Sequence, residues 1–191
     1  MRKLNIILIA TIGLALLTNW SRAQDTNNYA FAPATKLEAL GTNIGTLIIK
    51  ATTDVGGVSV KTGVVSVKAR EVTDSATGRK EQGVAVEIAR QDQYKETMLI
   101  DYDELNPLLN NIDYLSKVDV SVTALNTFDA AYTTKGGFRI AALGTKRTGL
   151  IQFAVRNTRT SAAPILISRE EMTRLWSLID QAKKQLEALG G

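Results

Sequence analysis

The sequence contains neither cysteine nor histidine among its 191 residues. Without cysteine the chain cannot form a disulfide, a thiolate nucleophile or a cysteine-ligated zinc site. Without histidine it lacks the commonest general base and the commonest metal ligand, so Ser-His-Asp catalysis is impossible in this chain alone. We therefore expect no cofactor and no resident metal. The chemistry that remains is limited to carboxylate pairs, Ser-Lys arrangements and calcium sites built from oxygen ligands.

Aromatic residues are also scarce, at 6% of the chain. Surfaces that bind single-stranded nucleic acid generally present exposed rings. Trp176, by contrast, lies on an apolar helical stripe, and Phe138 and Phe153 occur in strand-like alternation, so we expect all three in the core.

Residues 1–23 have the pattern of a signal peptide. Arg2 and Lys3 precede an apolar run of 14 residues from Leu4 to Leu17, and small residues follow at Ser21 and Ala23. Because a membrane-spanning helix needs roughly 20 apolar residues, cleavage near Ala23 is favoured over a permanent anchor. The sequence predicts an exported protein, periplasmic or secreted, with no stable membrane anchor after cleavage.

Removal of this leader changes the charge. The basic count falls from 23 to 20 against 19 acidic side chains, so the net charge falls from +4 to +1. The usual inference from a basic chain to nucleic acid therefore fails, and we expect no nucleic-acid partner. The remaining basic residues are concentrated late in the chain, where residues 118–191 hold 10 basic and 6 acidic side chains.

An internal repeat organises the rest of the sequence. Residues 100–115 align with residues 167–182 at a constant offset of 67, and their apolar positions coincide on one amphipathic helical stripe. Upstream, alternating apolar residues pair at the same offset and then at 73, where Gly63 meets Gly136. The difference of six residues falls in one predicted surface loop.

The repeat predicts an α+β fold of two structurally similar halves, about 35–117 and 118–190. Each is an antiparallel β-meander of about five strands followed by one amphipathic helix. A polar lead-in, 24–34, precedes a single compact domain, 35–191, which includes one further possible strand at 36–40. Expected strands are 44–52, 57–61, 63–72, 83–90 and 95–100, then 118–125, 127–134, 136–144, 149–157 and 163–167; expected helices are 102–116 and 169–189.

Two such halves would most simply pack around a pseudo-twofold axis, with each helix covering its own or its partner's sheet. In the order of its elements alone, the chain resembles the Whirly-type single-stranded-DNA-binding architecture. A barrel capped by the C-terminal helix, as in pleckstrin-homology-like folds, is the alternative arrangement. Fold analogy does not carry function, and we draw none from it.

Two groups of residues are candidates for binding. Asp101 and Asp103, with Glu104, could hold a cation or act as an acid-base pair, although helix capping explains carboxylates at this position more simply. Basic residues spread over three neighbouring strands and their turns would in part share a face, either as ordinary solvated charge or as a site for phosphate, sulfate or an acidic polymer. These residues are Lys135, Arg139, Lys146, Arg147, Arg156 and Arg159.

No motif in the sequence identifies an activity. The favoured interpretation is a non-enzymatic exported domain whose sheets bind a protein or polymer, through an apolar or single-sign patch. A second is a small-molecule or cation binder, or an enzyme, with converging carboxylates between the halves. A third is a homo-oligomer that pairs through sheet edges.

Overall fold

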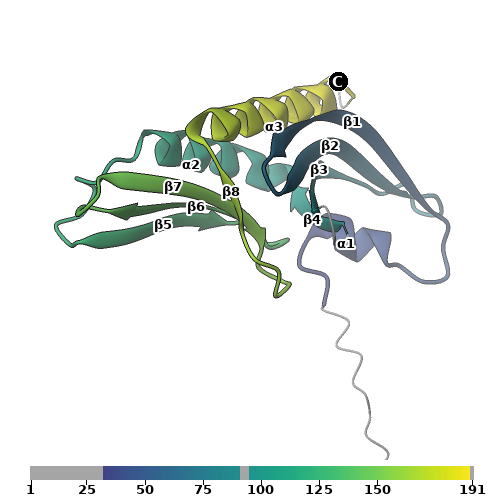
Figure 1. Cartoon of the computed structure of the whole chain (residues 1–191). Helices are drawn as coiled ribbons and strands as arrows, with labels where there is room; N and C mark the ends of the chain where they lie inside the picture. Colours follow the sequence, from purple (N-terminus) through teal and green to yellow (C-terminus); the bar gives the residue numbers. More distant parts are fainter. Residues whose placement is uncertain (1–31, 91–94, 190–191) are drawn as a thin grey trace, which may run out of the picture. The chain divides into compact units, whose positions relative to one another are not determined.

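The computed structural model describes residues 32–90 and 95–189, and those from Pro33 onward belong to one compact unit. The described chain forms two four-stranded antiparallel sheets, each a simple meander followed by a helix (Figure 1). The α+β class and the two similar halves predicted from the sequence are confirmed, with four strands in each half. The first half holds α1 (Lys36–Gly41), β1 (Ile48–Val60), β2 (Gly63–Asp74), β3 (Lys80–Arg90), β4 (Glu96–Asp101), the 3-10 turn η1 (Tyr102–Glu104) and α2 (Leu105–Lys117). The second holds β5 (Thr127–Thr133), β6 (Phe138–Thr145), β7 (Leu150–Asn157), β8 (Ile165–Ile167) and α3 (Arg169–Leu189).

One core joins the two halves. On each sheet, alternate residues of the central strands point inward, as the period of two requires. Val65 and Val67 on β2 are buried, and so are Phe138 and Ile140, their equivalents on β6 at the offset of 73. The apolar stripes of α2 and α3 complete the same cluster.

The helices are exchanged between the halves. α3, which follows the second sheet, packs on β1, β2 and β3 of the first, whereas α2, which follows the first sheet, packs on β5 and β6 of the second (Figure 1). The two helices also pack on each other. Of the two arrangements that the sequence allows, each helix therefore covers its partner's sheet. The two sheets share no strand pairing, so the described chain does not form one closed sheet.

The outer face of the first sheet, which is the side turned away from α3, is covered in part by α1. Leu37 and Leu40 of this short helix are buried against Val72 of β2, beside Ile48 and Leu99. Gly83 makes the approach possible, because a Cβ atom there would lie 2.7 Å from Cδ1 of Leu37 and 2.1 Å from the carbonyl oxygen of Ile100. The second sheet has no such helix on its outer face among the elements that the structure describes.

The prediction of five strands in each half was wrong, for two different reasons. Residues 48–52 and 57–60 of the predicted strands 44–52 and 57–61 belong to one strand, β1, with an irregularity of register between Asp54 and Gly56. Range 118–125 is not a strand. There Asp119 accepts a hydrogen bond from the amide of Ser121 on its side chain and one from the amide of Val122 on its carbonyl, which turns the chain.

Range 36–40, predicted as a possible strand, is helical as α1. Thr35 is the N-cap residue, and its hydroxyl accepts a hydrogen bond from the amide of Glu38 at 3.0 Å. The carboxylate of Glu38 in turn accepts from the amide of Ala34. This reciprocal pattern is close to a capping box, which begins a helix even where the following residues are few.

The predicted signal peptide, 1–23, and most of the predicted lead-in, 24–34, lie outside the described residues. Within the described ranges, no helix combines the length and the apolar character that crossing a membrane requires.

Candidate functional site

The first candidate residue, Asp101, ends β4 and is buried, with 2% of its surface exposed. Its carboxylate accepts hydrogen bonds from the backbone amides of Lys36 at 2.8 Å and Leu37 at 3.1 Å, which are the first amides of α1. It makes no capping hydrogen bond to η1, the turn that directly follows it. Asp101 therefore does cap a helix, but that helix is α1 and not the helix expected at 102–116, which directly follows Asp101 in the sequence.

Asp103 and Glu104 hold two further segments against η1. The carboxylate of Asp103 forms ion pairs with Lys36 at 3.1 Å and Lys135 at 3.8 Å. The hydrogen bond from Lys36 is the main reason that the pKa of Asp103 lies below its usual value. Glu104 accepts from the backbone amide of Lys135 at 2.9 Å, while its second oxygen is buried and has no hydrogen-bond partner among the described residues. The acidic group thus links α1 and the β5–β6 turn to the end of β4.

A second group lies on the outer face of the second sheet, defined here as the side of β5–β8 turned away from α2. The register places Arg139 of β6 directly opposite Arg156 of β7, and the next pair on this face is Ala141 opposite Ala154. Small side chains at the second pair leave a shallow depression of about 190 Å³. Its lining consists of Asp129, Arg139, Ala141, Leu143, Ala154, Arg156 and Pro164.

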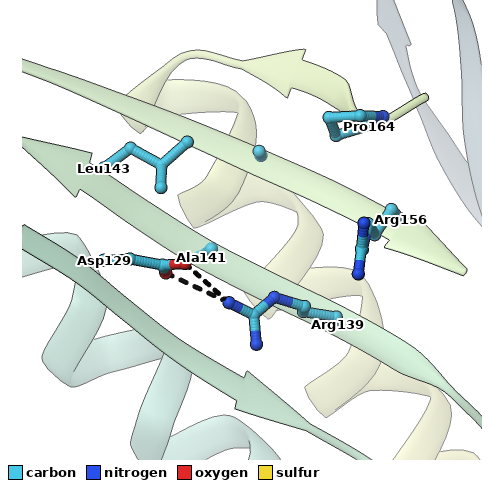
Figure 2. A pocket seen from close by; sticks show the side chains of 7 residues that line it. Asp129, Arg139, Ala141, Leu143, Arg156 and Pro164 are labelled. Atoms are coloured by element: carbon cyan, nitrogen blue, oxygen red, sulfur yellow. Dashed lines mark hydrogen bonds and ion pairs between the residues drawn. The ribbon is translucent and has the colours of Figure 1, made fainter. Parts of the chain in front are cut away.

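The two arginines differ in their partners. One guanidinium nitrogen of Arg139 donates to both carboxylate oxygens of Asp129, at 3.1 and 2.9 Å. Arg156 is exposed and has no hydrogen bond or ion pair with any residue in the described part of the chain. Figure 2 shows its guanidinium turned towards Arg139 over the depression. Cross-strand neighbours of like charge repel, so an anion bound between the two arginines would lower their electrostatic energy.

The structure separates the other predicted basic residues from this pair. Lys135 lies in the β5–β6 turn beside Asp103, and Arg159, after β7, forms an ion pair with Glu38 of α1. Lys146 and Arg147 are exposed in the β6–β7 turn at the far end of the second sheet. Of the six basic candidates, therefore, only Arg139 and Arg156 meet in one depression.

No family model, no curated protein and no solved structure matches the chain. In residues 32–90 and 95–189, no three acidic side chains are grouped so that they could hold a metal ion. The resemblance to the Whirly-type architecture accordingly remains one of element order.

Sequence reasoning missed the uncharged part of the depression and its one carboxylate, Asp129. The signal was present in the period-two alternation of the strand residues. Ala141 and Leu143 follow Arg139 at steps of two, and Ala154 precedes Arg156 by two, so all of them share the face of the arginines. What the sequence did not give was the strand register that places Arg139 opposite Arg156.

Proposed function

We propose that this chain is a non-enzymatic binding module that acts outside the cytoplasm and holds an anionic partner on the outer face of its second sheet. The observation that carries the proposal is the contrast between the two sheets. The outer face of the first sheet is used internally, by α1, whereas the equivalent face of the second presents a depression with two opposed arginines. Because the halves are structurally similar, a face that no described helix covers on one of them favours an external use.

The charge of the two sheets supports an anionic partner. Residues 127–167, which span the second sheet, contain six basic side chains and one acidic side chain, whereas residues 48–101 contain eight of each. On the first sheet the outer charges also neutralise one another, since Lys68 pairs with both Asp54 and Glu87. A surface of one sign attracts partners of the opposite sign and raises their association rate.

An apolar side chain near the arginines favours a specific contact over a purely ionic one. Leu166 lies on this outer face directly opposite Ala154 and is 53% exposed, and Leu150, at the other end of β7, is 61% exposed. Interfaces typically combine arginine with buried apolar contacts at their centre and polar groups at the rim. Export, which places the partner outside the cytoplasm, rests on the leader pattern of residues 1–23.

The experiment is a chemical-shift titration of the ¹⁵N-labelled protein with three polyanions: poly-L-glutamate, polygalacturonate and dextran sulfate. We expect shifts on the outer face of β5–β8 and an affinity that falls as the salt concentration rises. The matched control is Arg174→Gln, which removes one charge from an exposed position on α3. Shifts that map to α2 and α3, or an absence of binding at low salt, would contradict the proposal.

A further inference from the structure

We propose that the depression between Arg139 and Arg156 binds one carboxylate of an acidic protein segment, whose neighbouring aliphatic side chains pack on Leu143 and Pro164. This inference rests on the proposed function and names the partner of the same face. It follows from the charge of the depression, from the hydrogen-bond donors that it offers and from its apolar floor.

The charge of the depression fits a singly charged anion. Arg139 and Arg156 contribute two positive charges, and Asp129 removes one of them through its ion pair with Arg139. A ligand carboxylate at Arg156 would neutralise the remainder. A phosphomonoester carries between −1.5 and −2 at neutral pH, so it would leave excess negative charge next to Asp129.

The available donors also favour a carboxylate. Phosphate sites in proteins commonly use free backbone amides at a helix N-terminus or in a nest. Here the floor lies on β6 and β7, which pair with each other from Phe138 to Thr145 and with β5 and β8 on their other sides. The side-chain forks of the arginines are the donors that remain, and a planar carboxylate matches their geometry.

Asp129 shows how a carboxylate binds on this face. It is on the edge strand β5, with 51% of its side chain exposed, and both of its oxygens accept from one nitrogen of Arg139. A ligand carboxylate would bind Arg156 on the opposite side of the depression. Since Asp129 repels an arriving carboxylate, its charge limits the affinity of the site.

The floor and rim indicate a peptide rather than a sugar. The floor is formed by Ala141 and Ala154, with Leu143 and Pro164 beside them. The aromatic residues of the second sheet point to the core instead: Phe138 and Phe153 are buried there, and Phe128 and Tyr132 pack against it. The outer face therefore offers aliphatic contacts, which suit leucine or valine side chains next to a glutamate.

The test uses protein purified after expression of the full chain, and an acetylated, amidated pentapeptide with one glutamate between two leucines. Affinity is measured by chemical-shift titration, together with three further probes: the same peptide with glutamine, the same peptide with phosphoserine, and trigalacturonate. We expect the glutamate peptide to bind most tightly, about tenfold tighter than its glutamine analogue, as the loss of a charge-assisted hydrogen bond implies. Tighter binding of the phosphoserine peptide or of trigalacturonate would overturn the proposal.

Three variants locate the site. Arg156→Gln should weaken binding of the glutamate peptide about tenfold. Asp129→Asn should strengthen binding, because it removes the competing negative charge. The control Arg174→Gln removes the same charge from α3 and should leave the affinity unchanged within about twofold. A folded Arg156→Gln variant that binds normally, or a weaker Asp129→Asn variant, would overturn the inference.

A fourth variant separates this inference from the proposed function. Leu166→Glu places a negative charge on the outer face of β8, outside the lining of the depression. If Leu166→Glu weakens binding of the polyanions and Arg156→Gln does not, the face binds anions but the carboxylate site is wrong. If neither variant weakens binding, both the face and the site are wrong.

Discussion

The indole nitrogen of Trp176 donates a hydrogen bond to the backbone carbonyl of Leu109, at 3.0 Å. These two residues occupy equivalent positions in the two halves, 67 residues apart. Equivalent residues of two halves related by a twofold axis can touch only next to that axis. The pseudo-twofold packing expected from the sequence therefore predicts its axis between α2 and α3, at this contact.

Trp176→Phe should therefore lower the free energy of unfolding by about 1–2 kcal/mol, through the lost hydrogen bond and the smaller ring. Urea denaturation followed by far-ultraviolet circular dichroism measures this without relying on tryptophan emission. Tyr114→Phe, on the exposed side of α2, is the control, and it should leave stability unchanged. Equal midpoints for both variants would show that the interhelical hydrogen bond does not stabilise the fold.

The exchange of helices predicts that neither half folds alone. In a fragment of residues 32–117 the inner face of the first sheet lacks α3, which packs on β1, β2 and β3 in the intact chain and contributes Met172, Leu175 and Ile179 to the shared core. We expect poorly dispersed amide spectra from fragments 32–117 and 118–189 when separate, and native-like dispersion when they are mixed. A well-dispersed spectrum of 32–117 by itself would contradict the exchanged packing.

Gly136 should be among the most sensitive positions in the chain. A Cβ atom there would lie 1.8 Å from the carbonyl oxygen of Leu99, which belongs to the other half. Because the contacted atom is backbone, relief requires a backbone shift, and Gly136→Ala should cost about 3 kcal/mol, the upper end of the usual range for overpacking.

Gly41→Ala is the matched control for Gly136→Ala. Its nearest contact would be Cε of Lys50 at 3.3 Å, the end of a flexible side chain, so stability should change by less than about 1 kcal/mol. Thermal denaturation of both variants makes the comparison. Similar losses in the two would mean that the sequence change itself, and not the close approach of Gly136 to Leu99, is responsible.

The beginning of α3 offers a test of local helix stability. Ser168 and Glu171 form a capping box, in which the amide of Glu171 donates to the Ser168 hydroxyl at 3.1 Å and the amide of Ser168 donates to the Glu171 carboxylate at 2.6 Å. Ser168→Ala should cost about 1 kcal/mol in chemical denaturation, and Ser168→Asp should restore most of it. Failure of aspartate to restore stability would contradict a capping role.

Stability should fall in acid in part through Asp74. Its pKa is lowered mainly by the hydrogen bond from the Thr46 hydroxyl at 2.7 Å, with further bonds from the amides of Ala76 and Thr77. Because the pKa is lower in the folded state, this contribution to stability is complete above the unfolded value of about 3.9 and is lost as pH falls through the folded value. Asp74→Asn should be less stable than the parent at pH 7, and the difference should shrink towards pH 2. A difference independent of pH would show that the Asp74 carboxylate does not contribute to the loss of stability in acid.

Sequence patterns predicted the two helices of the repeat and the buried strands well because burial repeats in both halves at fixed offsets. They failed where a contact between residues distant in the sequence opposes the pattern. The sequence predicted a break between strands 44–52 and 57–61, yet Gly56 lies within β1, and a Cβ atom there would lie 2.8 Å from Cδ2 of Leu178 on α3. The need for glycine at position 56 therefore comes from a helix about 120 residues later in the chain. No local sequence pattern reports such a contact.

The candidate site was only partly predictable for a similar reason. Period-two alternation placed Arg139 and Arg156 on strand faces, but the pairing of β6 with β7 decided that they are direct neighbours. Asp101 satisfied the pattern of a cap for its own helix, whereas its carboxylate caps α1, more than 60 residues earlier in the chain. Residue type predicted the chemistry of each group, and tertiary pairing decided its partner.

The exchanged helices also constrain how the two halves can evolve. An inner-face substitution in one sheet must suit a helix encoded in the other half, so the inner positions of both halves must change together. The outer faces carry no such mutual constraint. Ser66, Lys68 and Arg70 on the first sheet correspond to Arg139, Ala141 and Leu143 on the second, at the same offset of 73 that keeps the inner residues apolar in both. Duplication followed by this exchange would preserve the core and leave one outer surface free to acquire a new specificity.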